Sequence, residues 1–299
     1  MSLLRKIVSL GYWLLDSEKS LSDFRKKANW KEEDLIVEAP SDKIMSPLVI
    51  TAHVFYPDFA TQLINNLKDL PRDTRVLITT PSNQIKEFLD SYLKSAGNPH
   101  DVRLTPNVGR NFGPLLVEFS KELLKVDNFI HVHSKKSLHS PQIAKEWLKR
   151  NTDLLLTRSG LLRISSITQT NPSIGLVYAD ASDLLRGINY RWGRSRRSAK
   201  IMFEHLPGFE KIEWRGKLSF PAGGMFWVKC DAIRPLLDIN WSYEAFPEED
   251  NQRDGEAQHS LERLVGQLPP SLNFIPVRFL KKLNRFERTD SRQIKRSAS

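Results

Sequence analysis

The chain has 299 residues, enough for one large domain or two small ones, and its 40% apolar and aromatic content is typical of a folded soluble protein. Its net charge of +10 favours anionic partners, namely nucleic acid, anionic lipid or phosphorylated compounds, without choosing among them. The single cysteine, Cys230, excludes an internal disulfide, and without an apolar run of about 18 residues no membrane-spanning helix is expected.

The first 45 residues differ in character from those that follow. Residues 4 to 15 show helical spacing of apolar side chains beside Arg5 and Lys6, which predicts a helix packed on the domain, with a membrane-surface helix as the alternative. Residues 16 to 45 are polar and charged, and the helical pattern weakens there. We therefore predict an N-terminal helical and charged arm over residues 1–45.

Strands and helices alternate from Pro47 onward. Strands are expected at residues 48–56, 76–80, 102–105 and 127–133, each followed by a segment with a helical apolar stripe. Crossovers of this length suit right-handed β-α-β units. The pattern predicts a Rossmann-like α/β fold: a mainly parallel sheet with helices on both faces and the carboxyl ends of these strands at one edge.

The second half of the chain is less regular. Further strands are expected at 174–178, 220–228 and 273–279, and Gly223-Gly224 inside the second of these indicates a bulge or a ligand close to the backbone. Residues 186–217 are basic and aromatic without periodicity, which predicts a lid, a binding loop or a partly disordered segment. A single domain over 46–280 and a basic tail over 281–299 complete the predicted division.

The segment from Asp127 to Ser137, DNFIHVHSKKS, changes from an apolar strand to a cluster of cations. Because side chains alternate along a strand, His131 and His133 would share a face, and Lys135 would follow them. Ligands of open α/β sheets bind beyond the carboxyl ends of the strands, so this segment predicts an anionic ligand. The alternative is one core histidine, one solvated histidine and a charged surface loop.

A second candidate is the loop from Asn107 to Pro114, which joins a strand to a helix. Gly109 and Gly113 would let a ligand approach the backbone, and Arg110 could bind two phosphate oxygens. A simple turn with a surface arginine is the alternative. The sequence holds no GxGxxG and no GxxxxGK[ST] motif, so neither the usual dinucleotide site nor a P-loop is supported.

The third candidate is an acidic segment at the start of a predicted helix. It contains Glu248, Glu249, Asp250, Asp254 and Glu256. Acids near a helix N-terminus can serve stability alone, and Asp254 could simply cap the helix. Combined with the cations elsewhere, however, these acids suit group transfer from a phosphorylated donor with a carboxylate as the base.

Together these segments resemble the rhamnan synthesis F proteins of bacterial polysaccharide assembly, which look like GT-A glycosyltransferases. The matching segments are His53 to Pro57, Asn107 to Arg110, His131 to Ser137, Phe220 to Trp227, and Gln252 to Gly255 with His259, Glu262 and Arg263. The resemblance covers roughly residues 47 to 270 and implies a GT-A-like fold, a nucleotide-sugar donor and a glycan or lipid-linked acceptor. The family usually has an aspartate where this chain has Asn111.

The roles that we expect from the motifs and the resemblance fall into three groups. Donor binding is assigned to Asn107, Gly109, Arg110, His131, His133, Lys135 and Lys136; acceptor binding to Gly223, Gly224, Trp227 and Glu249; catalysis to Asp254 as the base, with His259 ranked second. An inverting transfer fits one base without a nucleophile. No cofactor is expected, and Mg²⁺ or Mn²⁺ is not favoured because His-Val-His stands where many GT-A enzymes carry Asp-x-Asp.

The expected location is the cytoplasm, as a peripheral protein on the inner face of the plasma membrane. Phe279, Leu280, Leu283 and Phe286 lie among cations near the C-terminus, which predicts an anionic membrane surface as a partner. Nucleic acid is not favoured as a partner. The alternative function is a non-catalytic protein that uses residues 186–200, with Tyr190 and Trp192 among the cations, to bind nucleic acid or anionic glycan.

Overall fold

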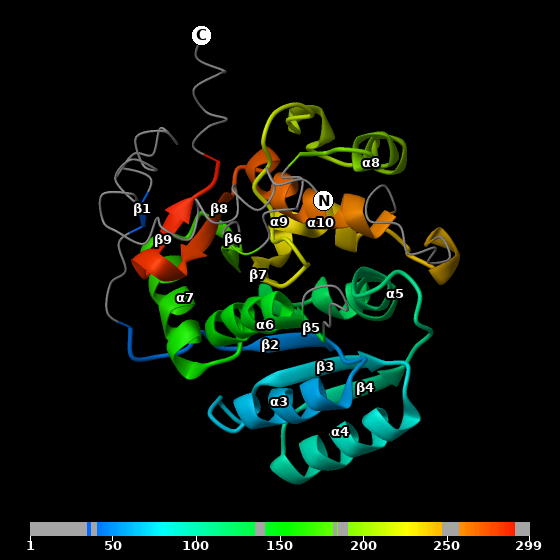
Figure 1. The fold of residues 1–299 in the computed structure, drawn as a ribbon, viewed down its shortest axis with the longest axis vertical. Coiled ribbons are helices and arrows are strands. Elements are labelled where there is room, and N and C mark those ends of the chain that lie inside the picture. Colours follow the sequence, from blue (N-terminus) through cyan, green and yellow to red (C-terminus); the bar gives the residue numbers. More distant parts are fainter. Residues whose placement is uncertain are drawn as a thin grey trace, which may run out of the picture.

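A computed structural model describes residues 35–36, 41–134, 141–181, 184, 191–246 and 257–290 (Figure 1). The strands are β1 (Leu35–Ile36), β2 (Val49–His53), β3 (Arg75–Thr80), β4 (His100–Leu104), β5 (Asn128–His133), β6 (Ile174–Ala179), β7 (Phe226–Lys229), β8 (Ile275–Leu280) and β9 (Arg285–Arg288). The α-helices are α3 (Pro57–Leu67), α4 (Asn83–Ala96), α5 (Phe112–Leu123), α6 (Pro141–Leu155), α7 (Arg158–Thr170), α8 (Ser195–Phe203), α9 (Cys230–Leu237) and α10 (Ala257–Ser271). Short 3₁₀ turns are η2 (Phe209–Lys211), η3 (Tyr243–Ala245) and η4 (Lys281–Leu283).

The described strands form one sheet in the order β1-β9-β8-β6-β7-β5-β2-β3-β4. Strands β4, β3, β2 and β5 are parallel neighbours, and β6 is parallel to β8. Only β7 and β9 run against the others among these strands. The predicted mainly parallel α/β sheet is confirmed, and the carboxyl ends of β2, β3, β4 and β5 lie at one edge.

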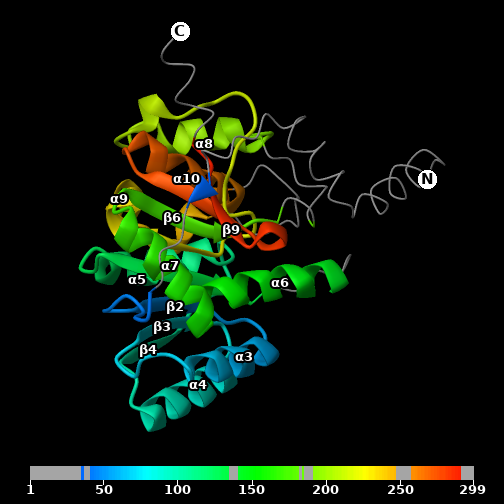
Figure 2. The same ribbon diagram turned by 90° about the vertical axis from the view of Figure 1, so that its left-hand side faces the viewer.

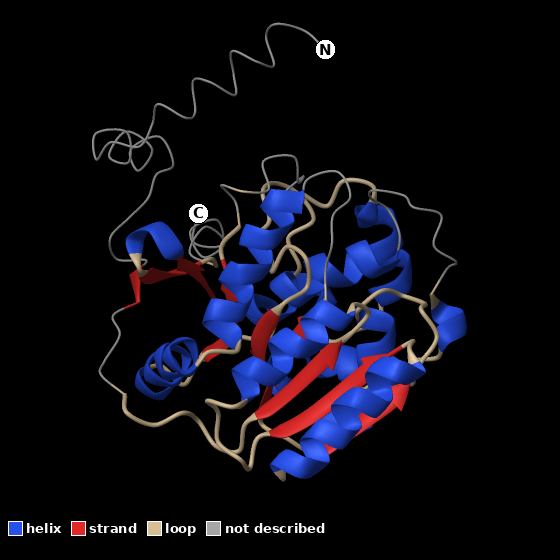
Figure 3. Ribbon diagram, turned by 60° about the horizontal axis from the view of Figure 1, so that its bottom comes forward, coloured by secondary structure: helices blue, strands red, loops and turns tan. Residues whose placement is uncertain are grey.

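Helices cover both faces of this sheet (Figures 2 and 3). Alternate strand residues pack on opposite sides: Ile50 belongs to the core under α3, α4, α6 and α7, whereas Val49 belongs to the core under α5, α9 and α10. Helix α8 lies outside α10 (Figures 1 and 2). Local signals set helix ends as expected, since Ser82 caps α4 by accepting from the Ile85 amide and Gly97 ends it with φ of 76°.

Two predicted elements differ in the structure. Strand β7 begins at Phe226 rather than near Phe220, because Gly223 and Gly224 take φ values of 89° and 76° that a strand cannot contain. The basic segment expected to lack periodicity contains α8, which buries Ala199 and Phe203 one turn apart. Two apolar residues among cations were too weak a stripe for the sequence to indicate a helix.

The sheet extends past both predicted domain boundaries. Ile36, from the predicted arm, pairs with Phe286, from the predicted tail, and Phe286 is fully buried. Its ring lies 5.0 Å from that of Phe279, so the aromatic residues expected to contact a membrane belong to the core. Residues 281–290 are therefore part of the domain, and residues 291–299 of the predicted tail lie outside the described residues. Along the described chain, no helix combines the length and apolar character that crossing a bilayer requires.

Candidate functional site

Histidines from two neighbouring strands line up at the carboxyl edge of the sheet. In the parallel register of β2 and β5, His53 stands beside His133 and Thr51 beside His131. The rings of His131 and His133 stack with centroids 6.3 Å apart and an interplanar angle of 26°, so the prediction that they share a face is confirmed. Both are nevertheless buried, with 1% and 8% of their surface exposed.

The hydrogen bonds of His131 determine its tautomer. The Thr51 hydroxyl donates its one proton to the Ile130 carbonyl (3.0 Å), so it must accept from His131 Nδ1 (2.9 Å). His131 Nε2 then accepts from the Asn111 amide nitrogen at 3.2 Å. Burial, with repulsion from His133 and His53, holds the pKa of His131 well below its usual 6.5. His131 is thus a neutral group that orients Asn111.

His53 shows the same behaviour at the end of β2. Its Nδ1 lies 2.9 Å from the Thr79 hydroxyl, and burial, reinforced by His133, lowers the pKa of His53 to about 3. His133 places Nε2 against the Gly223 carbonyl and Nδ1 against the Ser134 carbonyl. His131 and His53 therefore supply shape and hydrogen bonds at this edge rather than positive charge.

The glycine loop, Ala222 to Gly224 before β7, is fixed by side chains from α6, from α10 and from the start of α5. Trp147 of α6 donates to the Ala222 carbonyl (3.2 Å), and a Cβ on Gly223 would lie 2.1 Å from the Trp147 ring. The Gly223 amide donates to a Glu262 carboxylate oxygen of α10 at 2.5 Å. On the other side, a Cβ on Gly224 would meet the Asn111 amide at 2.6 Å. The two glycines are required by the chain's own packing.

Arg110 and His259, which lie 149 residues apart in the chain, are brought together here. A guanidinium nitrogen of Arg110 donates to His259 Nε2 at 3.1 Å. His259 lies in the first turn of α10, and Glu262, three residues further on, lies on the same side of the helix. The predicted donor-binding arginine and the second-ranked catalytic residue thus contact each other, one helical turn from a carboxylate that binds the glycine loop.

The remaining predicted residues divide into three groups. Gly109 packs against Phe246, which a Cβ would approach to 2.7 Å, so its conformation serves the loop itself. Asn107 is exposed, whereas Trp227 is 1% exposed and donates to the Asn128 side chain within the core under α6 and α7. Lys135, Lys136, Glu249 and Asp254 lie outside the described residues, so their roles stay predictions.

Glu262, Trp147 and Asn111 contact the site but were assigned no role from the sequence, although Glu262 belongs to a segment that resembles the family and Asn111 is a position that departs from it. A role for Glu262 could have been inferred from its spacing, because it lies one helical turn after His259. Trp147 and Asn111 gave no such signal, since their partners are distant in sequence: Ala222 for the indole and His131 for the amide.

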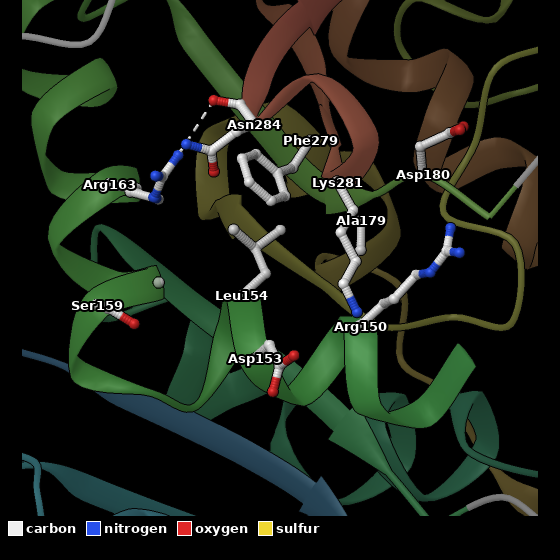
Figure 4. A pocket seen from close by; sticks show the side chains of 11 residues that line it. Arg150, Asp153, Leu154, Ser159, Arg163, Ala179, Asp180, Phe279, Lys281 and Asn284 are labelled. Carbon is white, nitrogen blue, oxygen red and sulfur yellow. Dashed lines mark hydrogen bonds between the residues drawn. The ribbon is translucent and has the colours of Figure 1, made fainter. Parts of the chain in front are cut away.

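A separate cavity of about 320 Å³ lies further along the same edge, beside the carboxyl ends of β6 and β8 (Figure 4). It is lined by Arg150, Asp153, Leu154, Ser159, Gly160, Arg163, Ala179, Asp180, Phe279, Lys281 and Asn284. Several of these charges pair within the chain, as Arg150 and Lys281 do with Glu146. The predicted site residues that the structure describes do not line this cavity.

The chemistry of the site rests on one guanidinium, one carboxylate and the histidine side chains. The described part of the chain holds no group of three or more His, Cys, Asp or Glu side chains placed to bind a metal ion. Arg110 can bind an anion, and Glu262 and His259 can accept protons or hydrogen bonds. This set can bind a phosphorylated ligand and position a hydroxyl nucleophile.

Comparisons with known proteins identify the family. Two relatives, both named "Uncharacterized protein WxcX", come from Xanthomonas campestris pv. campestris strains B100 and ATCC 33913. Each is 26% identical to this chain over 260 residues, which cover 86% of this chain and 34% of the relative. The chain therefore spans about a third of the length of these relatives. The family model for rhamnan synthesis protein F matches residues 27–272, and the chain belongs to the rhamnan synthesis protein F family.

Proposed function

We propose that this chain is a glycosyltransferase that moves a sugar from a nucleotide-diphosphate sugar onto a growing surface polysaccharide or lipid-linked glycan. Membership of the rhamnan synthesis protein F family points to a part in polysaccharide synthesis and favours rhamnose as the sugar. The observation that carries the proposal is the contact between Arg110 and His259 beside Glu262, at the sheet edge where α/β folds bind ligands.

In the proposed reaction an acceptor hydroxyl oxygen attacks the anomeric carbon while the bond from that carbon to the diphosphate breaks. The bonding electrons leave with the diphosphate, whose growing negative charge Arg110 would stabilise. Asp254 would accept the hydroxyl proton as the general base, and Lys135 and Lys136 would hold the diphosphate with Arg110. Attack opposite the leaving group inverts the anomeric centre.

The pairing of Arg110 with His259 suggests how the donor prepares the site. In the structure, the Arg110 guanidinium occupies the Nε2 lone pair of His259. A diphosphate would compete for the same guanidinium because charge-assisted hydrogen bonds are stronger than bonds to a neutral ring. Donor binding would then release His259 Nε2 to accept a hydrogen bond from the acceptor hydroxyl, which gives His259 a supporting role beside Asp254.

A thermal-shift screen tests this proposal. The purified protein is heated with uridine, thymidine, guanosine and cytidine diphosphates and with their sugars, each in EDTA and again with Mg²⁺. A ligand that binds only the folded state raises the melting temperature, so one nucleotide should give a clear increase. We expect that increase in EDTA as well, because Lys and Arg would neutralise the diphosphate. A screen without any shift would contradict the proposal; a shift only with Mg²⁺ would contradict its metal-free form.

A further inference from the structure

Helix α8 presents three cations and an isoleucine on its solvent-facing side. It buries Ser195, Ala199 and Phe203, and it exposes Arg196, Arg197, Lys200 and Ile201, which we call the α8 surface. Ile201 is 64% exposed, more than the other exposed large hydrophobic side chains of the described chain. Residues three and four apart are neighbours on a helix, so these four side chains form one continuous patch.

The charge around the α8 surface is strongly positive. Residues 191–217 contain eight Lys and Arg residues, all exposed, and only three acids, Glu204, Glu210 and Glu213. Within the part of the chain that the structure describes, no ion pair joins Arg196, Arg197 or Lys200 to a carboxylate. Their charge is therefore available to an external anionic partner.

The aromatic residues near α8 form a support beneath it. The rings of Trp192 and Trp214 lie 4.6 Å apart, and Phe209 lies 4.7 Å from Trp214. Trp192 is 2% exposed and donates to the Glu213 carbonyl, while Lys200 lies over the Trp214 ring at 5.3 Å. These rings are engaged with one another, so they do not offer the open faces on which nucleic-acid bases stack.

Helix α8 and the residues before it are hydrogen-bonded to helix α10. The Ser260 hydroxyl of α10 donates to the Ser195 carbonyl of α8 (3.2 Å), and Arg263 donates to the Arg191 carbonyl (2.8 Å). The same helix α10 carries His259 and Glu262. In Figures 1 and 2, α8 lies on the outer side of α10, at the end of the molecule away from α4.

We propose that the α8 surface docks the protein on an anionic lipid bilayer. Arg196, Arg197 and Lys200 would contact the anionic headgroups while Ile201 enters the boundary with the acyl chains, a combination of cations and an exposed apolar side chain that suits a membrane interface. Docking through α8 would hold α10, and with it the site, next to a lipid-linked acceptor. The role of docking in bringing the site to an acceptor rests on the proposed transferase function. The docking itself does not, because it needs no substrate.

Vesicle co-sedimentation of the full chain tests the docking without any activity assay. The protein is mixed with vesicles of phosphatidylglycerol and phosphatidylcholine, or of phosphatidylcholine alone. We expect binding only to the anionic vesicles, weakening as salt is added. One basic residue near such a surface changes binding by about fivefold, so the triple variant R196Q/R197Q/K200Q should bind about 100-fold more weakly. Ile201→Asn should lower binding several-fold at unchanged charge.

Matched controls come from elements other than α8. The variant K94Q/K121Q/K125Q removes three exposed cations from α4 and from the end of α5 and the residues after it, and Phe88→Asn removes a side chain that is 46% exposed on α4. Both controls should bind the anionic vesicles like the unaltered protein. Circular dichroism verifies that each variant is folded. If the triple variant does not fold, the binding of Ile201→Asn still decides the test.

Three outcomes would overturn the inference. The first is no binding of the unaltered protein to anionic vesicles, and the second is equal binding by the α8 variants and the controls. The third is a triple variant that is no longer retained on immobilised single-stranded DNA or heparin but binds vesicles normally. That result would show that the α8 surface binds a soluble polyanion rather than a bilayer. In each case a melting-temperature increase with a nucleoside diphosphate would still support the transferase, so the two failures are distinguishable.

Discussion

The buried imidazoles of His53 and His131 make the stability of the protein depend on pH. The pKa of each histidine lies below the usual 6.5, and that of His53 is lowered to about 3. Below pH 6.5 these two side chains therefore bind protons in the unfolded chain but not in the folded protein. The free energy of unfolding should therefore fall as pH decreases, with a slope that approaches about 1.4 kcal/mol per pH unit for each histidine as pH falls towards 5. Urea unfolding at pH 6.5, 5.75 and 5.0 measures this slope.

A pair of substitutions checks the origin of that slope. His53→Asn removes one of the two imidazoles whose pKa is lowered and should reduce the slope by about half, whatever its effect on stability at pH 7. His205→Gln removes a histidine whose side chain is 93% exposed and should leave the slope unchanged. Equal slopes for the unaltered protein and His53→Asn would show that His53 takes up protons equally in both states.

Gly223 and Gly216 separate backbone strain from side-chain crowding. Both have positive φ, 89° and 91°, so an alanine at either position meets a similar backbone cost. A Cβ at Gly216 has nothing within 4 Å, whereas at Gly223 it would overlap the Trp147 ring. Gly223→Ala should therefore destabilise the protein by about 1–3 kcal/mol more than Gly216→Ala in urea unfolding. Equal losses would mean that Trp147 does not fix the glycine loop.

Asp254 as the general base predicts a loss of turnover without a loss of stability. Asparagine has nearly the shape of aspartate and is as good an N-cap wherever a cap is needed, so Asp254→Asn should change stability by well below 1 kcal/mol. Asparagine cannot take up the proton of the acceptor hydroxyl, so kcat should fall about 100-fold while donor binding is kept. Turnover within a few-fold of the unaltered enzyme would eliminate Asp254 as the base.

At the scale of elements, β9 anchors the C-terminal end of the fold. It pairs with β8 and β1, buries Phe286 completely and places Glu287 against Arg278, which also binds Asp180. A chain ending after Leu280 loses both β9 pairings, the buried Phe286 and the ion pair between Glu287 and Arg278, so it should melt at a much lower temperature or fail to fold. A chain ending after Asp290 keeps them and should melt like the full chain. Equal melting temperatures would show that β9 is dispensable.

The sequence predicted those elements whose apolar pattern or caps lie within their own residues. The strands up to His133 and their helices were predicted because each carries a continuous apolar pattern or cap within its own residues, as in Ser82 to Gly97. Strand β9 has one buried apolar residue, Phe286, in the sequence RFER, and its stability comes from partners elsewhere. The reversed direction of β7 has no local signal either, since pairing with β5 and β6 decides it.

The candidate site was predicted in part for the same reason. Alternation along β5 was enough to place His131 and His133 on one face, and the motif order suggested both Arg110 and His259. The contacts that decide their chemistry could not be predicted. Thr51 and Asn111, which fix His131 as a neutral ring, approach it only when separate strands and helices assemble.

At the scale of the whole molecule, the antiparallel β7 joins the two halves of the site. Because β7 runs against β5, its amino end lies at the carboxyl edge of β5, and the glycine loop that precedes it meets His133 there. Helix α10 then reaches the same loop through Glu262. The residues proposed for donor binding and His259, the second residue proposed for catalysis, thus lie around one loop, with α8 attached on the outer side of α10.

Calorimetric titration with the nucleoside diphosphate found in the screen tests the central claim, that the donor binds beside Arg110, most directly. The unaltered protein should bind it in EDTA, and Arg110→Gln should bind about 10- to 100-fold more weakly, the effect of losing a hydrogen bond to a charged group. Arg163→Gln, which alters a similarly half-buried arginine in the separate cavity, should bind like the unaltered protein. Unchanged affinity in Arg110→Gln, or an equal loss in Arg163→Gln, would contradict the account.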